Sequence, residues 1–342
     1  MRTSRNPIYL YSRVELRRNL GDNPLPEHAK PNQKERIVQD VFWAVDEILQ
    51  KMGSDYHLYV LSDLSPQELQ LLKKKGLISP AEVTAWEALI LDSSEEIALE
   101  INRTDHITIR ITKPGFQLQE CVKTASLLDA LIAKRLPIAY HKRFGYLTSS
   151  VAEVGTGMRI ILCGTFPGLV LTEAVEEVIQ QFRGHKIILK KVEQYAQGHL
   201  FLLNNRTTLG VSEVEIEEMM YTSGKELEEQ EITARKNLYQ KEQIRFEDRA
   251  WRAYGLLTSA RLLPFREALF NIALLRCGYH AIPQWEEIVP PEVSGELFYG
   301  IDTEFLALFH SLEPVENEEI YAVRAQWVRN ILSSRFAGKN SG

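Results

Sequence analysis

The sequence predicts an α+β fold, in which an antiparallel sheet is flanked by helices and a helical C-terminal domain follows. Residues 88–115 alternate apolar and polar side chains and are rich in isoleucine and threonine, which is typical of strands. Serine-led capping boxes along the chain indicate where helices begin. Beyond residue 255 the pattern is mostly helical as far as Ser333. Together these features define the α+β class.

Three helices are predicted before the first strand. Apolar residues recur at helical spacing over residues 34–52, and Gly53 follows as a stop. The segments at Ser65 and Ser79 each combine an N-cap serine, a proline at the first helical position and a glutamate at the third. Both segments are therefore expected to open helices, and the first of these is expected to end at Gly76.

Two strands, joined around residues 92–94, account for the alternating stretch. The second is predicted to direct one apolar set to the core: Ile101, Ile107, Ile109 and Ile111. Its polar set is predicted to face water or a cleft: Glu100, Asn102, Thr104, His106 and Thr108. Asp105 and His106 are adjacent on this strand, so we expect them to point to opposite faces and to have structural roles.

The remaining elements alternate between strands and helices. A helix is predicted over residues 119–135, and "MRIILCGTF" predicts a buried strand after it. Another helix is expected to begin at Thr172 and to end near Gly184. The segments "HKIILKKV" and "GHLFLLNN" predict a strand pair. A capping box at Ser212 predicts a long helical region to about residue 255, and the helical tail is expected to break near residues 290–291.

The composition narrows the class of protein. The chain has 342 residues, 44% of them hydrophobic and 25% charged, which is typical of a globular protein. A net charge of −6 argues against a general nucleic-acid binder. The sequence contains neither a bilayer-length apolar run nor a signal-peptide pattern, and its three cysteines lack metal-ligand spacing. We therefore expect a cytoplasmic protein without a metal site.

The stretch "FGYLTSSVAEVGTGMR", residues 144–159, has the composition of a phosphate-handling segment. Glycines allow a ligand to approach the backbone, and Arg159 could bind an anion. The alternative is a tight turn into a buried strand, with the glycines needed for backbone shape. The sequence positions no histidine base beside Ser149 and Ser150, which argues against a nucleophile there.

Six stretches, taken in order, resemble motifs of the phosphagen (ATP:guanidino) kinase superfamily, and most closely its bacterial McsB-type protein-arginine kinases. They are "YSRVELRRNL" (11–20), "GLISP" (76–80), "NRTDHITI" (102–109), "GYLTSSVAEVGTGMR" (145–159), "LNNRTTLGVSE" (203–213) and "EDRAWRAYGLL" (247–257). Their order and spacing agree with the family from about residue 10 to residue 260, and more loosely to about 335.

The resemblance implies transfer of the γ-phosphoryl group of ATP to a guanidinium. Arginines and Mg²⁺ would hold the phosphates, and a carboxylate would accept the proton of the guanidinium. The positions that match the family's phosphate-binding residues form a remnant site: Arg13, Arg159, Gly155, Thr156, Gly157 and Lys190.

At the other matched positions the family's residue is replaced. The resemblance places Glu15 and Thr108 at arginine positions, Thr104 at that of the catalytic glutamate, Ser150 at that of the substrate-binding cysteine and Glu153 at that of an asparagine. Glu100 is a conceivable substitute base because it shares the predicted strand face with Thr104. Four residues of strand span roughly 13 Å, however, which argues against a direct replacement.

The resemblance and these replacements together predict a McsB-like pseudokinase that regulates partners by binding. The resemblance implies a stress pathway of arginine phosphorylation or Clp proteolysis, and partners such as an McsA-like activator, a true McsB kinase or a Clp ATPase. The alternative is a divergent but active protein-arginine kinase, which would use ATP and Mg²⁺. In the tail, "IYAVRA" (320–325) retains only Arg324 and Ala325 of the family's phosphoarginine pocket.

The predicted domains are a phosphotransferase-like domain over residues 1–250, helical to about residue 85, and a helical domain over residues 251–335. The second is expected to support homo-oligomers, as a dimerisation domain.

Overall fold

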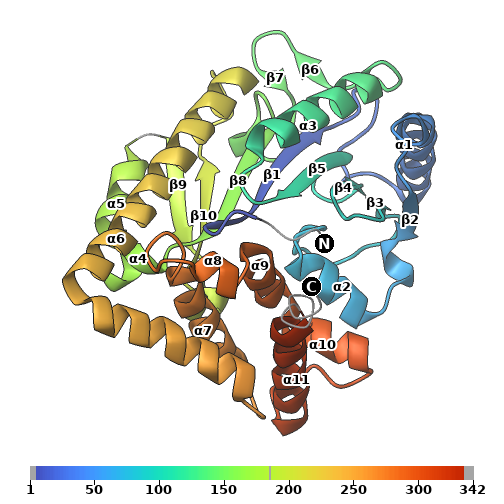
Figure 1. Ribbon diagram of the computed structural model, residues 1–342. Coiled ribbons are helices and arrows are strands. Elements are labelled where there is room, and N and C mark those ends of the chain that lie inside the picture. The colour runs from blue at the N-terminus through green and yellow to red at the C-terminus, as the bar shows by residue number, and fades with distance from the viewer. Residues whose placement is uncertain (1–4, 185, 335–342) are drawn as a thin grey trace.

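The computed structural model describes residues 5–184 and 186–334 (Figure 1). The strands are β1 (Tyr9–Arg18), β2 (Tyr56–Val60), β3 (Ala88–Asp92), β4 (Ile97–Ile101), β5 (Ile107–Pro114), β6 (Tyr140–His141), β7 (Gly145–Tyr146), β8 (Met158–Thr165), β9 (Ile187–Lys191) and β10 (Leu200–Asn205). The α-helices are α1 (Pro31–Lys51), α2 (Pro66–Lys74), α3 (Leu118–Ala133), α4 (Pro167–Leu171), α5 (Val175–Arg183), α6 (Glu213–Ser259), α7 (Phe265–Cys277), α8 (Trp285–Ile288), α9 (Pro291–Gly300), α10 (Thr303–His310) and α11 (Glu318–Ser334). Short 3₁₀ segments cover Leu61–Asp63, Val151–Glu153 and Glu193–Gly198.

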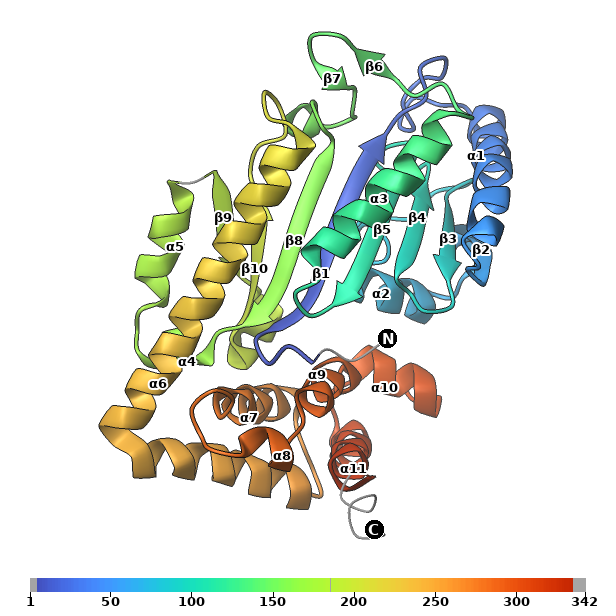
Figure 2. The same cartoon turned by 45° about the horizontal axis from the view of Figure 1, so that its top comes forward.

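One antiparallel sheet organises the molecule, with the strand order β2-β3-β4-β5-β1-β8-β10-β9. Every second residue of its central strands is apolar and faces the helices, for example Val14 and Leu16 on β1 and Ile160 and Leu162 on β8. Figure 2 shows α3 and α6 lying across this face. The core between sheet and helices also includes buried residues of α1 and α5.

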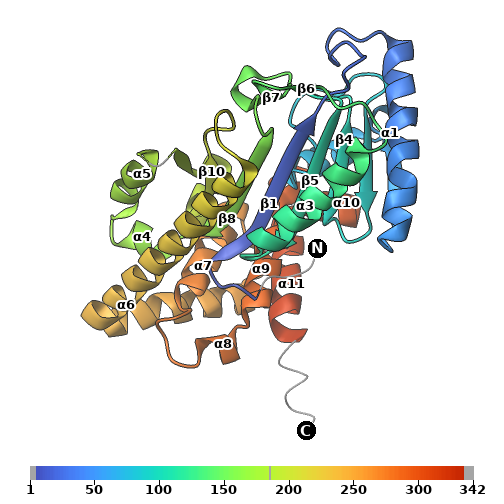
Figure 3. The same cartoon turned by 90° about the horizontal axis from the view of Figure 1, so that it is seen from above.

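The opposite face of the sheet is covered only in part. At the β3–β4 end, residues from α2 and its flanking loops pack on Leu89 and Leu91. At one end of the strands, α7, α8, α9 and α11 pack on Leu10, Cys163 and Leu200 (Figures 2 and 3). The β6–β7 hairpin lies at the other end of the strands. Between these coverings, the middle of the face carries charged side chains.

Most predicted elements are confirmed. The helix predicted over residues 34–52 is α1, the helix that follows Ser65 is α2, and the helix predicted over residues 119–135 is α3. The buried strand is β8, and the later strand pair is β9 with β10. Ser212 caps α6, and the break near residues 290–291 separates α8 from α9.

The capping box predicted at Ser79 does not open a helix. Instead, the Ser79 backbone N–H and hydroxyl donate hydrogen bonds to the buried Glu100 carboxylate, at 2.6 and 2.8 Å. The strand predicted to run past Glu100 is likewise wrong, because the chain turns between β4 and β5. Asn102 adopts a positive φ of 58°, and its N–H bonds the carbonyl of His106 at 3.1 Å.

Two other boundaries differ from the prediction. Thr172 follows α4 as its C-cap, and the helix expected to begin there starts instead at Val175 and ends at Arg183. The prediction of a helical segment to about residue 85 is wrong in part, because this segment also contains the strands β1 and β2. In the sheet, β1 lies between β5 and β8. The charges of β1 obscure its alternation, because they occupy the face that the helices leave open.

The predicted domain boundary at residue 250 lies within α6. The buried apolar residues of α6 as far as Ala234 belong to the core under the sheet, whereas Ala250 and Leu257 belong to the core of the C-terminal helices. Glu242 departs from helical geometry between these two parts. Within the described residues, no helix is long and apolar enough to cross a membrane.

Candidate functional site

The register of the central strands assembles a row of charges on the face opposite α3 and α6. Glu15 on β1 pairs with Arg110 on β5 on one side and with Arg159 on β8 on the other. Directly opposed residues of antiparallel strands have Cβ atoms about 5 Å apart. The Glu15 side chain therefore lies between those of Arg110 and Arg159 at the middle of the sheet.

Glu15 acts as an internal counterion for this row. Its Oε1 accepts a hydrogen bond from Nε of Arg110 at 3.0 Å, and its side chain is almost entirely buried. Burial alone would raise the pKa of Glu15, but the neighbouring arginines, led by Arg110, outweigh it and hold the pKa at about 2. Glu15 is therefore ionised at neutral pH and offsets the positive charge of its neighbours.

Arg17, two residues further along the same face of β1, is also neutralised by carboxylates. Its guanidinium lies 3.0 Å from Glu153 and 3.7 Å from both Glu15 and Asp105. Burial raises the pKa of Glu153, although Arg17 and Arg159 lower it in part. Arg17 thus binds protein carboxylates where a phosphate site needs free cations.

Arg13, predicted as part of a remnant phosphate site, is engaged by backbone. Its three guanidinium nitrogens donate to the hydroxyl of Thr112 and to the carbonyls of Lys75 and Gly76, at 2.8 to 2.9 Å. Gly76 adopts a positive φ of 66°, and a Cβ at this position would collide with Nη1 of Arg13. The glycine therefore makes room for Arg13 to tie the end of α2 to the sheet.

No carboxylate occupies the position at which the resemblance places the family's catalytic glutamate. Thr104 lies in the β4–β5 turn with its side chain exposed. Glu100, the conceivable substitute, is buried: its carboxylate accepts hydrogen bonds from Ser79 and lies 2.6 Å from Nη1 of Arg110. Thr108, also buried, pairs with Glu100 on β4 and with Arg17 on β1.

Arg103, next to Thr104, fixes the segment that follows α2. Its guanidinium donates to the carbonyls of Ser79, Ala81 and Glu82 at 2.8 to 2.9 Å. It also pairs with Glu87, and with Glu100 at 3.2 Å. Buried charges therefore run without interruption from Glu15 through Arg110, Glu100 and Arg103 to this segment.

Asp105 and His106 are fully buried in the turn and have structural partners. One oxygen of Asp105 accepts hydrogen bonds from the side-chain amide of Asn19 at 2.6 Å and from the Ser149 N–H at 2.7 Å. His106 Nδ1 accepts from the Leu20 N–H at 3.0 Å. Burial lowers the pKa of His106, so the ring is neutral at pH 7.

The glycine-rich turn approaches the chain's own backbone. A Cβ on Gly155 would collide with the carbonyl of Thr208, and one on Gly157 would lie 2.8 Å from the carbonyl of Arg17. Thr156 between them is buried, and its N–H bonds the Thr208 carbonyl at 3.1 Å. The geometry thus favours the interpretation in which these glycines shape a turn. The hydroxyl of Ser149 is buried without a hydrogen-bond partner in the described part of the chain.

Arg159 is half-buried, and its side chain has no hydrogen bond or ion pair to residues 5–184 or 186–334, which is also true of Lys190. The sheet does not bring Lys190 to it. Lys190 is exposed on β9 and pairs with Leu202, which pairs with Cys163 on β8. Cys163 lies four residues from Arg159, a separation of roughly 13 Å along the strand.

The tail arginine is equally engaged. Arg324 on α11 is fully buried and donates to the carbonyls of Ile301 and Leu263, at 2.7 and 3.0 Å, and to the hydroxyl of Thr303. Its Nη1 also lies 3.2 Å from Glu316. This arginine therefore holds C-terminal helices together.

Sequence reasoning missed Arg17 and Arg110, which carry much of the charge on this face. The signal was available in the period of two: Arg13, Glu15 and Arg17 follow one another at alternate positions of β1, and Arg110 lies between Thr108 and Thr112 in the polar set of β5. Among the described residues, no group of histidine, cysteine, aspartate and glutamate side chains could hold a metal ion.

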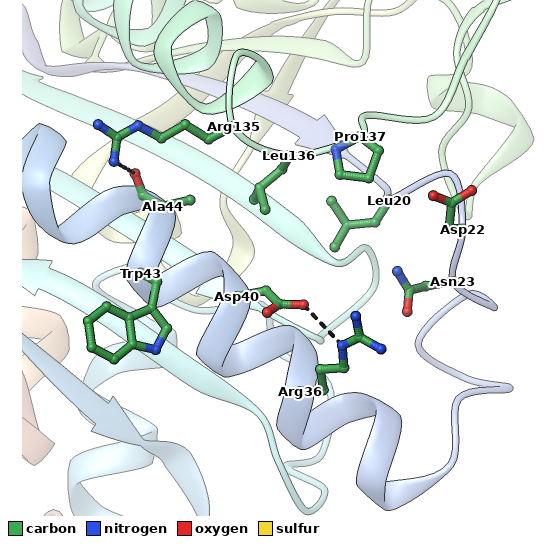
Figure 4. A pocket seen from close by; sticks show the side chains of 10 residues that line it. All are labelled: Leu20, Asp22, Asn23, Arg36, Asp40, Trp43, Ala44, Arg135, Leu136 and Pro137. Carbon is green, nitrogen blue, oxygen red and sulfur yellow. Dashed lines mark hydrogen bonds and ion pairs between the residues drawn. The ribbon is translucent and has the colours of Figure 1, made fainter.

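A separate hollow of about 580 Å³ lies away from this face (Figure 4). It is lined by α1, by the loop after β1 and by the segment that follows α3. Arg36 and Asp40 pair across one turn of α1 at 3.5 Å, and Trp43 is largely exposed. The hollow shares no lining residue with the charged row.

The comparisons with known proteins agree with this architecture. The sequence model of the ATP:guanido phosphotransferase C-terminal catalytic domain matches residues 36–234. The protein-arginine kinase of Symbiobacterium thermophilum is 34% identical over 278 residues, which cover 79% of this chain and 78% of the relative. The protein-arginine kinase of Brevibacillus brevis is 30% identical over 332 residues, which cover 95% and 92%.

Solved structures show the same fold at lower identity. The crystal structure of lombricine kinase superposes with a TM-score of 0.56 and 14% identity over 66% of both chains. The duplicated taurocyamine kinase of Schistosoma mansoni with bound transition-state analogue components gives a TM-score of 0.59 and 17% identity, over 66% of this chain and 33% of that one. Because the family's sequence model matches more than half of the residues of this chain, the chain belongs to the ATP:guanido phosphotransferase family.

Proposed function

We propose that this chain is a pseudokinase related to the protein-arginine kinases, which has lost phosphoryl transfer and acts by binding partners. The observation that carries the proposal is Glu15, a buried carboxylate between Arg110 and Arg159 with a pKa of about 2. Phosphoryl transfer requires cations that are free to neutralise the triphosphate. Here the protein itself supplies the negative charge.

The other groups that the reaction needs are also engaged or absent. Arg13 is used by backbone carbonyls, Arg17 by three carboxylates, and Glu100 by Ser79 and Arg110. Removing one electrostatic contact to the reacting group costs about 10²–10³ in rate, and removing a general base about 10²–10⁴. These losses do not simply multiply, but together they leave transfer near background. The residues of this face therefore do not fit ATP and Mg²⁺, and no reaction step is assigned to them.

The role that remains is regulation by association. The relatives are protein-arginine kinases, so the proposed partners are such a kinase, an activator of McsA type or a Clp ATPase in the same stress pathway. Homo-oligomers formed through the C-terminal helices, and a place in the cytoplasm, belong to the same proposal. Its test is whether adding this chain changes the rate of a purified protein-arginine kinase.

A divergent but active protein-arginine kinase is the second candidate, and one observation favours it. Glu153 is half-buried with a raised pKa, and it lies in the electrostatic field of Arg159, whose guanidinium has no ion pair within residues 5–184 and 186–334. A carboxylate with a raised pKa next to a cation is a candidate general base.

One experiment separates the two candidates. The full chain is incubated with ATP, Mg²⁺ and an arginine-rich protein, and acid-labile phosphoarginine is detected by mass spectrometry and ³¹P NMR. The pseudokinase predicts no product above a protein-free control. Product that disappears in Arg159→Ala and Glu153→Gln, while a variant in the separate hollow such as Asp40→Asn retains it, would establish the active kinase.

A further inference from the structure

A second cavity lies where the sheet meets the C-terminal helices. Its volume is about 440 Å³, within the range of small-molecule sites. Its walls come from β1, β8 and β10, from α2, from the segment after β9, and from α9, α10 and α11. It is therefore built by both ends of the chain, and the proposed partner-binding role does not use it.

The floor and roof of the cavity are largely apolar and aromatic. Tyr11, Cys163 and Leu202 are direct neighbours across β1, β8 and β10 and form the floor. The aromatic side chains opposite come from α9, α10 and α11: Phe298, Tyr299, Phe305 and Trp327. A Cβ on Gly300 would collide with the Trp327 ring, so the bare backbone of this glycine lets the indole lie against α9. Aromatic rings of the C-terminal helices thus face the sheet across the cavity.

The lysines at the rim of the cavity are paired with carboxylates, whereas Glu296 on α9, also in the lining, has no ion pair within residues 5–184 and 186–334. Lys74 on α2 binds Asp302 at 3.2 Å and also binds Glu304 on α10. Lys75 binds Glu95 at 2.7 Å. These ion pairs leave neither lysine free to attract a phosphate or carboxylate, which argues against an anionic ligand.

Two of the tyrosines that line the cavity differ in whether their hydroxyls have a hydrogen-bond partner. The hydroxyl oxygen of Tyr299 is buried and has no hydrogen bond to any residue of the described ranges. The hydroxyl of Tyr195, in the same lining, donates to Asp302 at 3.3 Å. A buried hydroxyl without a partner costs free energy that a ligand acceptor would recover.

We propose that this cavity binds a small, flat aromatic molecule without negative charge, carrying one hydrogen-bond acceptor for the Tyr299 hydroxyl. The aromatic walls supply apolar contact, and the single hydroxyl supplies orientation, as in most small-molecule sites. Because Lys74 and Lys75 are held in ion pairs, the rim offers neither of them as a free cation for a polyphosphate. Because its walls belong to the sheet, α2 and the C-terminal helices, the ligand also stabilises the docking of these parts.

The probes are quinoline, which has a ring-nitrogen acceptor, and naphthalene, which has the same shape without it. Both are titrated into the full chain labelled on leucine and valine methyls, since Leu71, Leu202 and Val192 line the cavity. We expect both probes to shift these methyl signals, with quinoline binding about three- to tenfold more tightly because of one hydrogen bond. If neither probe shifts these methyl signals, the proposal is overturned.

Two conservative variants test the hydroxyl. Tyr299→Phe should weaken quinoline about three- to tenfold and leave naphthalene unchanged. Tyr195→Phe is the matched control, because its hydroxyl already has a partner, and it should keep the preference for quinoline. A preference that survives in Tyr299→Phe contradicts the role of the hydroxyl.

Two further experiments test where the probes bind and whether a charged ligand binds at the same place. Leu202→Trp should fill the cavity and abolish the shifts from both probes, provided that its circular dichroism matches that of the native chain. MgATP should leave the methyl signals of the cavity unchanged. If MgATP shifts these methyls as quinoline does, the cavity is a nucleotide site and a ligand without negative charge is ruled out.

Discussion

Replacing Glu15 by glutamine removes the charge at the centre of the proposed face while keeping the shape of the side chain. The pKa of about 2, compared with an ordinary value of 4.5, measures how much the native surroundings favour the ionised carboxylate. At about 1.36 kcal/mol per pKa unit, this difference corresponds to about 3 kcal/mol of stability at pH 7. The value agrees with the roughly 3–5 kcal/mol that breaking a buried ion pair costs.

The pH dependence of this effect has a defined sign. A carboxylate whose pKa is depressed by folding contributes stability above its unfolded pKa, and this stability is lost as the pH falls through the folded value. The window for Glu15 therefore runs from about 4.5 down to about 2. Urea unfolding followed by circular dichroism should give Glu15→Gln a deficit of about 3 kcal/mol at pH 7, which shrinks to about 1 kcal/mol at pH 3.

Glu47→Gln is the matched control, because Glu47 also bonds an arginine and a lysine but does so at the surface. It should change the free energy of unfolding by much less than Glu15→Gln, since solvent screens exposed pairs. The reasoning would be refuted if the two variants were equally stable at pH 7, or if the Glu15→Gln deficit stayed the same down to pH 3.

Three further predictions concern the two arginines that tie neighbouring segments to this face, Arg13 and Arg103, and the buried thiol of Cys163. Gly76→Ala should lower stability by about 2 kcal/mol in urea unfolding, because the left-handed backbone is strained and the Cβ displaces Arg13; a neutral result would contradict the contact. Arg103→Gln should cost about 3–5 kcal/mol and open residues 79–87 to limited proteolysis, and unchanged protection there would count against these contacts. Burial raises the pKa of the Cys163 thiol to about 12, so iodoacetamide at pH 8 should alkylate it only after unfolding; rapid labelling of the native chain is the opposing outcome.

The fold was largely predictable because its signals are local. The capping boxes at Ser65 and Ser212 and the apolar alternation of β5 depend on neighbouring residues alone. The Ser79 box failed because a distant carboxylate, Glu100, accepts the hydrogen bonds that a helix start would have used. Local patterns do not contain such long-range competition.

The site was predictable in its positions but not in its contacts. The resemblance located Arg13, Glu15 and Arg159, and the structure places Glu15 and Arg159 side by side. It could not show that Arg13 donates to carbonyls more than 60 residues away, or that Lys190 lies in another row of the sheet. Those facts depend on strand register and on the docking of α2, which no short motif specifies.

The central claim, that Glu15 supplies negative charge among the arginines of this face, is tested most directly by titrating MgATP into the full chain with isothermal calorimetry. Glu15→Gln is measured beside it, because this substitution removes the counterion between Arg110 and Arg159. The account predicts no binding heat at millimolar MgATP for the native chain, and detectable binding only when the carboxylate is removed. A micromolar dissociation constant for the native chain that is weakened by Arg159→Ala would contradict it.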